Sequence, residues 1–279
     1  MTGALVLVAT PIGNLGDVSD RARDELAQAD LVCCEDTRRT GALLRHLGLR
    51  VAELRRLDDH TEFESIPALV EQIAQGARVV LVSDAGTPGI SDPGQRLVAA
   101  VAEQGFVVTG VPGPVAAVHG LVVSGLATDR FVFEGFLPRR GEARDRQLAE
   151  IAAQGRTTVL YESPHRLADT LRDLAEVAGG DRRAAVAREL TKLHEEIRRG
   201  SLNELAEWAD GGVRGEVVVV IDGAPAPAEA SDDQILKALG ERLAAGRSRR
   251  DAVTDVAAAT GARRGRVYDL ALGLDRPEE

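Results

Sequence analysis

The 279-residue sequence has little cysteine, lysine or aromatic side chain. It holds two tyrosines, one tryptophan and five phenylalanines, which limits recognition of nucleic-acid bases by aromatic stacking. The only cysteines, Cys33 and Cys34, are adjacent in an apolar run and lack metal-ligand spacing. We therefore expect a buried structural pair in a reducing compartment and no metal site. Lys192 and Lys237 are the only lysines.

Several nucleotide-binding motifs are also missing. The sequence contains neither G-x-x-x-x-G-K-[ST] nor G-x-G-x-x-G, which excludes the phosphate loop of NTPases and the pyrophosphate turn of dinucleotide enzymes. No basic region precedes apolar residues 5–8 and no apolar run approaches ~18 residues, so we expect no signal peptide, no membrane span and a soluble cytoplasmic protein. With a formal net charge of -10, any RNA partner must meet local basic patches.

The chain is organised around the segment Ser83–Gly94, which reads S-D-A-G-T-P-G-I-S-D-P-G. It follows four apolar residues and precedes a helical pattern at 95–104, which predicts a strand-loop-helix turn of the kind that binds ligands in open α/β sheets. With two carboxylates, Asp84 and Asp92, and no basic residue, the loop suits a ligand with hydroxyls, an amine or a positive centre. Asp92 and Pro93 are predicted as the N-cap and first residue of the helix. An ordinary loop with capping aspartates is the alternative.

Strand and helix patterns alternate through the first 115 residues, which predicts a parallel sheet covered on both faces. A helix is expected at 66–75. The ends of several predicted strands would then converge on one crevice. These strand ends are Pro11–Asn14, Glu35–Arg38, Asp84–Gly94 and Pro112–Pro114.

The remainder predicts a second α/β domain with some antiparallel pairing, a linker and a small helical tail. Helices expected at 231–245, 252–260 and 263–272 resemble a helix-turn-helix, and a three-helix cap with solvated arginines is the alternative. The expected boundaries are 1–115 and 116–223 for the two α/β domains, 224–230 for the linker and 231–279 for the helical domain.

Long motifs spread over the chain resemble the ribosomal RNA small-subunit methyltransferase I family, a branch of the tetrapyrrole methylases. Besides the central loop they include A-T-P-I-G-N-L at 9–15, E-D-T-R at 35–38, Y-E-S-P-H-R at 161–166 and R-E-L-T-K at 188–192. The resemblance implies two α/β domains that hold S-adenosylmethionine in the cleft between them. It also implies a homodimer that methylates the ribose 2′-hydroxyl of a cytidine in the decoding region of 16S ribosomal RNA, within the 30S subunit.

Carried over residue by residue, the resemblance implies a set of cofactor-binding positions, to which the central loop adds Asp84. We expect Asp84 and Asp92 to hold the loop or the polar ends of the cofactor without touching sulfur, because a carboxylate there would stabilise the ground state more than the transition state. The segment Asp58–Glu62 departs from the family pattern, so its role stays open. The implied positions are Pro11, Gly86, Thr87, Ile90, Val115, Ala116, Tyr161, Glu162 and Leu190.

The hydroxyl proton requires a general base, and Lys192 is one candidate, with Glu189 as its tuning partner, because a buried lysine can lose its proton near neutral pH. Binding of an RNA phosphate by Lys192 is the alternative. Glu35 and Asp36 are the next candidates, with capping of the helix that begins at Thr37 as their alternative role.

RNA binding is expected to depend on shape and phosphate contacts. Arg144 belongs to one local basic cluster in the sequence, and His165 and Arg166 have the alternative role of completing a helix start. Rival functions are methylation of a tetrapyrrole or another small molecule, and a non-catalytic RNA-binding module of ribosome assembly. The expected RNA-binding residues are Arg139, Arg140, His165, Arg166, Arg188, Arg263, Arg264 and Arg266.

Overall fold

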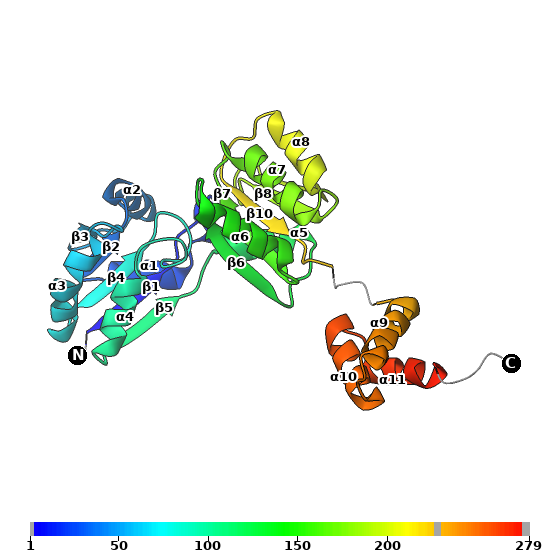
Figure 1. Cartoon of the computed structure of the whole chain (residues 1–279). Coiled ribbons are helices and arrows are strands. Elements are labelled where there is room, and N and C mark those ends of the chain that lie inside the picture. The colour runs from blue at the N-terminus through cyan, green and yellow to red at the C-terminus, as the bar shows by residue number, and fades with distance from the viewer. Residues whose placement is uncertain (1–2, 226–229, 275–279) are drawn as a thin grey trace. The chain divides into compact units, whose positions relative to one another are not determined.

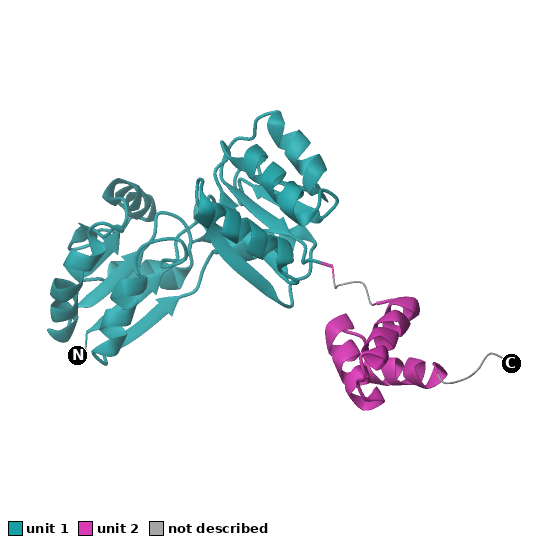
Figure 2. Ribbon diagram, in the orientation of Figure 1, with its two compact units in different colours: residues 1–224 teal, residues 225–279 magenta. Residues whose placement is uncertain are grey.

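The computed structural model describes residues 3–225 and 230–274, and the chain forms two compact units, residues 1–224 and 225–279 (Figure 2). The break between the units falls at the start of the linker expected at 224–230, of which residues 226–229 lie outside the described residues. A boundary at 115/116 between two methylase domains stays a prediction, because residues 1–224 group together as one compact unit.

The first sheet of the larger unit contains five parallel strands in the order β3-β2-β4-β1-β5 (Figure 1). Alternate residues of β1 face opposite ways: Val6 joins the core under α1 and α2, whereas Leu5 joins the core under α3 and α4. The expected parallel sheet with both faces covered is thus confirmed. The strands are β1 (Ala4–Val8), β2 (Leu31–Cys34), β3 (Leu54–Arg56), β4 (Arg78–Val82) and β5 (Val107–Val111). The helices are α1 (Asp20–Ala27), α2 (Thr37–Leu47), α3 (Glu62–Ala74) and α4 (Gln95–Glu103), with a short 3-10 helix η1 (Leu15–Asp17).

The second sheet is mixed, with the order β6-β7-β10-β8-β9, as the pattern after residue 130 predicts. Only β6 and β7 run parallel, and the other neighbours are antiparallel. Helices α6, α7 and α8 cover one face and α5 covers the other. The strands are β6 (Phe131–Phe136), β7 (Thr157–Glu162), β8 (Arg183–Arg188), β9 (Glu196–Ser201) and β10 (Val217–Ile221). The helices are α5 (Ala116–Ser124), α6 (Glu142–Ala153), α7 (Leu167–Ala178) and α8 (Leu202–Asp210).

The smaller unit contains helices α9 (Asp232–Ala244), α10 (Arg249–Thr260) and α11 (Arg264–Gly273), which share a core of their own. Ser231 and Gln234 form a reciprocal capping box at the start of α9, the helix expected at 231–245. The expected helical tail is therefore confirmed. Its likeness to a helix-turn-helix stays a prediction.

The start of α4 differs from the prediction. Asp92 and Pro93 do not begin this helix, whose N-cap is Gly94 at φ 128°. The Glu62 carboxylate of α3 instead accepts hydrogen bonds of 3.1 Å from the backbone N–H groups of Gly94 and Leu97. A cap supplied from 32 residues away leaves no local signal, and it frees Asp92 for another role.

Two further differences lie near α3. The helix begins at Glu62 rather than at the expected residue 66, because Asp58 accepts hydrogen bonds from the backbone N–H groups of His60 and Thr61 and turns the chain there. The segment Asp58–Glu62 therefore has a structural role. The short strand β3 was not predicted, since three residues give no periodic signal. In the described part of the chain, no helix is long and apolar enough to cross a membrane.

Candidate functional site

A cavity of about 300 Å³ lies between the carboxyl ends of the first sheet and the second sheet of the larger unit. Eight of the ten expected cofactor-binding residues line it: Gly86, Thr87, Ile90, Val115, Ala116, Tyr161, Glu162 and Leu190. Asp92, expected to hold the loop or the polar ends of the cofactor, also lines it. The sequence assigned no cofactor role to several further lining residues, among them Ile12, Ser91, Phe136, Glu216 and Val218. The lining residues Val217 and Val218 of β10 could not be recognised from the sequence, because a strand that is buried on both faces is apolar at every position and shows no alternation.

Hydrogen bonds between three strand-end loops shape the floor of this cavity. Thr10 and Gly86 exchange backbone hydrogen bonds of 2.9 and 3.1 Å, which join the loops after β1 and β4. The Thr87 hydroxyl donates to the Pro114 carbonyl at 3.1 Å and so attaches the loop after β5. Gly86 has φ 90°, and a Cβ there would lie 3.3 Å from Ile12 Cγ2, so glycine is needed for this close approach.

Tyr161 forms part of the opposite wall. Its hydroxyl accepts a hydrogen bond of 3.1 Å from the backbone N–H of Ala117, so it caps α5, whose N-cap residue Val115 has no side-chain acceptor. Its ring packs against Phe133 and Phe136, at centroid distances of 5.0 and 5.5 Å. The phenol is thereby fixed beside the cavity, and burial raises its pKa.

Backbone strain is concentrated at the cavity. In residues 3–225 and 230–274, the non-glycine residues with positive φ are Ser91 at 60°, Glu189 at 51° and Thr191 at 66°. Ser91 lines the cavity, and the other two flank the lining residue Leu190. Such conformations cost about 1–3 kcal/mol each and cluster where a site must be held in a fixed shape.

Lys192 does not line the cavity itself, and its ammonium donates hydrogen bonds of 2.8 Å to both Glu189 and the lining residue Glu216. Partial burial lowers the pKa of Lys192, but the hydrogen bonds to the two carboxylates outweigh it, and the pKa rises above the usual lysine value. The Lys192 hydrogen bond in turn lowers the pKa of Glu189. A lysine held protonated in this way is poorly suited to be a general base, and it anchors the loop.

Glu35, Asp36 and Asp84 lie together outside the cavity, around a separate polar hollow that Arg38, Arg39 and Arg56 also line. Asp36 is the N-cap of α2, and hydrogen bonds from the Arg38 side chain and backbone hold its pKa well below the usual range. This geometry matches the capping alternative. Asp84 accepts from the Asp36 backbone N–H at 3.1 Å, so it holds the loop as expected without lining the cofactor cavity. Pro11 is likewise absent from the cavity lining.

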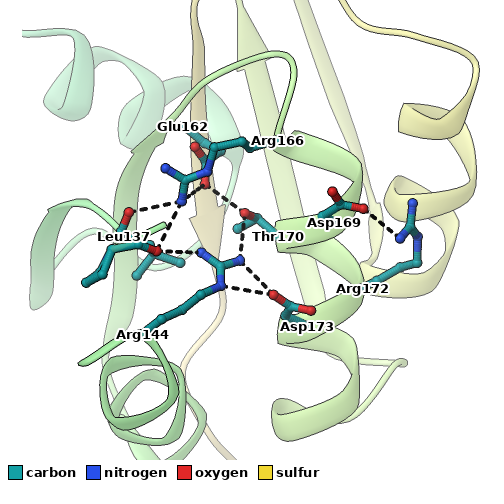
Figure 3. A network of polar contacts seen from close by, with 9 residues as sticks. Leu137, Arg144, Glu162, Arg166, Asp169, Thr170, Arg172 and Asp173 are labelled. Carbon is teal, nitrogen blue, oxygen red and sulfur yellow. Dashed lines mark hydrogen bonds and ion pairs between the residues drawn. The ribbon is translucent and has the colours of Figure 1, made fainter. Parts of the chain in front are cut away.

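Glu162 connects the cavity to a buried polar network on α6 and α7 (Figure 3). Its carboxylate accepts a 2.7 Å hydrogen bond from the Thr170 hydroxyl and pairs with Arg166 at 3.3 Å. Arg166 also donates to the backbone carbonyls of Leu137 and Pro138. Arg166 thus begins α7 and binds the protein itself, in agreement with the structural alternative rather than with an RNA contact.

Arg144 belongs to the same network and not to an exposed basic cluster, so that part of the prediction is wrong. Its guanidinium is buried and donates to the Pro138 carbonyl, the Thr170 hydroxyl and Asp173. A buried arginine must find such acceptors, because an unpaired charge in the interior is costly.

The other expected RNA-binding residues differ in whether they are exposed or held in an ion pair. Arg139, Arg140 and His165 are exposed in the larger unit, and Arg263 and Arg264 are exposed in the smaller one. Arg188 is paired with Glu196 at 2.7 Å, and Arg266 with Asp232 at 2.7 Å. The exposed arginines are therefore the better candidates for phosphate contacts.

Residues 4–206 match the family of tetrapyrrole (corrin/porphyrin) methylases. A ribosomal RNA small subunit methyltransferase I from Mycobacterium tuberculosis (strain CDC 1551 / Oshkosh) is 50% identical over 273 residues, covering 97% of this chain and 95% of that protein. The protein of the same name from Synechocystis sp. (strain ATCC 27184 / PCC 6803 / Kazusa) is 44% identical over 276 residues, covering 98% and 99%.

Solved structures share the fold at low sequence identity. Diphthine synthase matches with a TM-score of 0.60 at 16% identity, covering 79% of this chain and 90% of that one. Uroporphyrin-III C-methyltransferase from Thermus thermophilus, complexed with S-adenosylhomocysteine, matches with a TM-score of 0.55 at 19% identity, covering 78% and 96%.

Proposed function

We propose a function for this chain on the basis of its family. The chain belongs to the tetrapyrrole methylases and, within them, to the ribosomal RNA small subunit methyltransferase I family. It is accordingly an S-adenosylmethionine-dependent methyltransferase. We further propose that its acceptor is the ribose 2′-hydroxyl of a cytidine in 16S ribosomal RNA of the 30S subunit, and that it acts in the cytoplasm.

The cavity between the sheets fits the cofactor. Its volume of about 300 Å³ lies at the lower end of the range of small-molecule sites, about 300–1,000 Å³. Bare backbone at Gly86 allows a flat group to lie against the loop, and Ile12, Leu190 and Val218 supply apolar walls. When bound, the cofactor supplies a methyl group on a positively charged sulfur. The chain must orient it, exclude water and take up the hydroxyl proton.

One observation carries the choice of ribosomal RNA over a small-molecule acceptor. The general methylase match ends at residue 206, whereas the similarity to the relatives named for ribosomal RNA covers 97% or more of the chain and so includes the smaller unit. The exposed Arg263 and Arg264 of this added unit suit contacts with phosphate groups, which an RNA acceptor supplies in number.

Exposed arginines support phosphate binding despite the acidic total charge. Arg139 and Arg140 follow β6 and precede α6, in a segment held by the inward-facing guanidinium groups of Arg144 and Arg166. The proposed RNA contacts are those of Arg139, Arg140, His165, Arg263 and Arg264. Such contacts weaken steeply with salt.

A homodimer is proposed, as the family resemblance implies, with β5 and α5 as candidate contact elements. The edge strand β5 carries Val107, which is 52% exposed, and α5 carries Val118 and Val122, which are 45% and 64% exposed. An edge strand and a helix with exposed valines are features that proteins usually cover.

The proposal is tested by incubating the purified chain and radiolabelled S-adenosylmethionine with 30S subunits, naked 16S RNA, a tetrapyrrole or no acceptor. We expect label in the 30S RNA, and hydrolysis and mass analysis should place the methyl group on a 2′-oxygen of cytidine. A Gly86→Val variant should lose both cofactor binding and label, because its side chain would enter the cavity floor at φ 90°. Label only in the tetrapyrrole, or none with any acceptor, would contradict the proposed acceptor.

A further inference from the structure

Asp92 lies on the wall of the cofactor cavity without being needed to cap α4. It follows the strained Ser91 and precedes Pro93, and the next residue, Gly94, is held by the Glu62 carboxylate at 3.1 Å. Its loop is therefore fixed on both sides. This carboxyl group is about half-buried and lies close enough to Tyr161 on the opposite wall to influence it.

Of the described residues that line the cavity, only Asp92, Glu162 and Glu216 carry a carboxylate. The Glu162 side chain is fully buried and already accepts from the Thr170 hydroxyl and the Ser163 backbone N–H. The Glu216 side chain is 73% exposed and holds Lys192. Asp92 is the one of these three carboxylates that is held neither by an ion pair nor by the Glu162 network, and its hydrogen bond is with Ser83.

We propose that Asp92 is the catalytic base that removes the proton from the ribose hydroxyl, an inference that rests on the proposed function. The O–H bond breaks and its proton goes to the Asp92 carboxylate, while the hydroxyl oxygen forms the new bond to the methyl carbon. The electron pair of the broken sulfur–carbon bond stays on sulfur, which becomes a neutral thioether. Protonated Asp92 then releases its proton to water.

The surroundings of Asp92 suit this role. Burial, together with the negative charges of Glu35, Asp84 and Asp59, raises the pKa of Asp92 to about 6, against the opposing hydrogen bond with Ser83. Arg39 pairs with Asp84 at 3.5 Å, and Tyr161 faces Asp92 from β7. A base accepts a proton most effectively when its pKa lies near the working pH, and it is still ionised at neutral pH.

The test uses the full chain with Asp92→Asn, and with Glu103→Gln at the exposed far end of α4 as the matched carboxylate-to-amide control. Calorimetry measures affinity for S-adenosylhomocysteine, and single-turnover transfer to 30S subunits is followed from pH 5 to 9. We expect Asp92→Asn to keep the affinity within about threefold while the rate constant falls by roughly 10²–10⁴-fold. The control should match the parent chain in both measurements.

The pH profile gives a second readout. The parent rate constant should rise with pH through about 6 and then level off, whereas the residual Asp92→Asn rate should lack this limb. Glu35→Gln should move the limb to lower pH, because it removes the neighbouring charge that contributes most to the raised pKa. Carbon-13 NMR of labelled aspartate should show one carboxyl that titrates near pH 6 and disappears in Asp92→Asn.

Three results would overturn the role. Full turnover in Asp92→Asn would exclude a base at this position. A loss of affinity as large as the loss of rate would make Asp92 a cofactor-holding residue. Absence of label in the parent 30S reaction would instead remove the proposed function and this role with it, and it is recognised because the parent chain itself then fails.

Discussion

The backbone N–H of Asn14 donates a 3.1 Å hydrogen bond to the Thr191 hydroxyl, across 177 residues of sequence. The contact joins the loop after β1 in the first sheet to the loop after β8 in the second, beside the cofactor cavity. Neighbouring Gly13 packs so closely that a Cβ there would lie 2.4 Å from Lys192 Cγ and 2.9 Å from the Thr191 hydroxyl. This junction fixes the two walls of the cavity relative to each other.

Gly13→Ala should force these loops apart. We expect a loss of about 1–3 kcal/mol in the free energy of unfolding, because the new methyl group has no space. Cofactor affinity should fall about tenfold or more, which corresponds to about 1.4 kcal/mol. Calorimetry and denaturant unfolding measure the two effects. Gly41→Ala is the control, since its Cβ would make only an ordinary contact inside α2, and stability should rise by roughly 0.5–1 kcal/mol.

Thr170→Val should weaken the network that holds Glu162. The buried hydroxyl donates to Glu162 at 2.7 Å and accepts from Arg144 at 3.1 Å, and valine can do neither. The free energy of unfolding should fall by about 2–3 kcal/mol. Cofactor binding should also weaken, because Glu162 lines the cavity. Thr254→Val, exposed in α10, should change stability by less than about 0.5 kcal/mol. Equal effects of the two substitutions would show that the network contributes little.

Arg139 and Arg166 should differ in how their loss affects RNA binding. Removal of exposed Arg139 by substitution with glutamine should reduce the slope of log affinity against log salt by about 0.7–0.9, the effect of one phosphate contact. Arg166→Gln should leave the slope unchanged but lower the melting temperature, because this guanidinium binds the Leu137 and Pro138 carbonyls. Binding to 30S subunits at several salt concentrations separates them, and a reduced slope for Arg166→Gln would contradict the structural role.

Asp92→Asn should be more stable than the parent chain at neutral pH. The pKa of Asp92 is raised to about 6 from 3.8, so the folded chain prefers the protonated form. The protonated carboxyl group therefore contributes to the stability of the folded chain below pH 3.8, and this contribution is lost as pH rises through about 6. We expect a gain of about 1–2 kcal/mol at pH 7 after allowance for solvent screening of this half-buried group. Urea unfolding at pH 4 and pH 7 checks it, and a gain of the same size at both pH values would contradict it.

Residues 1–224 alone should bind S-adenosylmethionine as well as the full chain, because the cavity lining runs from Ile12 to Val218 and the smaller unit has its own core. Affinity for 30S subunits should fall, since Arg263 and Arg264 are lost. Calorimetry and filter binding measure the two affinities. A truncated chain that binds RNA as tightly as the parent would remove the proposed role of the helical unit.

The sequence by itself determined the alternation of strands and helices, the mixed second sheet, the helical tail and the position of the central loop. These features follow from local patterns: apolar runs in buried strands, the Ser231 capping box and glycine in the bend at Gly86. The motifs also identified eight of the residues that line the cavity, since motif residues fall at strand ends that a parallel sheet brings together.

Only the tertiary structure decided which charged groups are free to act. Lys192, Asp36 and Arg166 are residue types suited to catalysis or RNA binding. In the folded chain, however, each forms an ion pair within the protein, and the sequence alone does not show that these pairs form. The helix start expected at Asp92 is supplied by Glu62 from another helix, and this leaves Asp92 in the cavity wall. Protonation and availability depend on burial and on neighbours brought together by folding, and local sequence patterns do not record either.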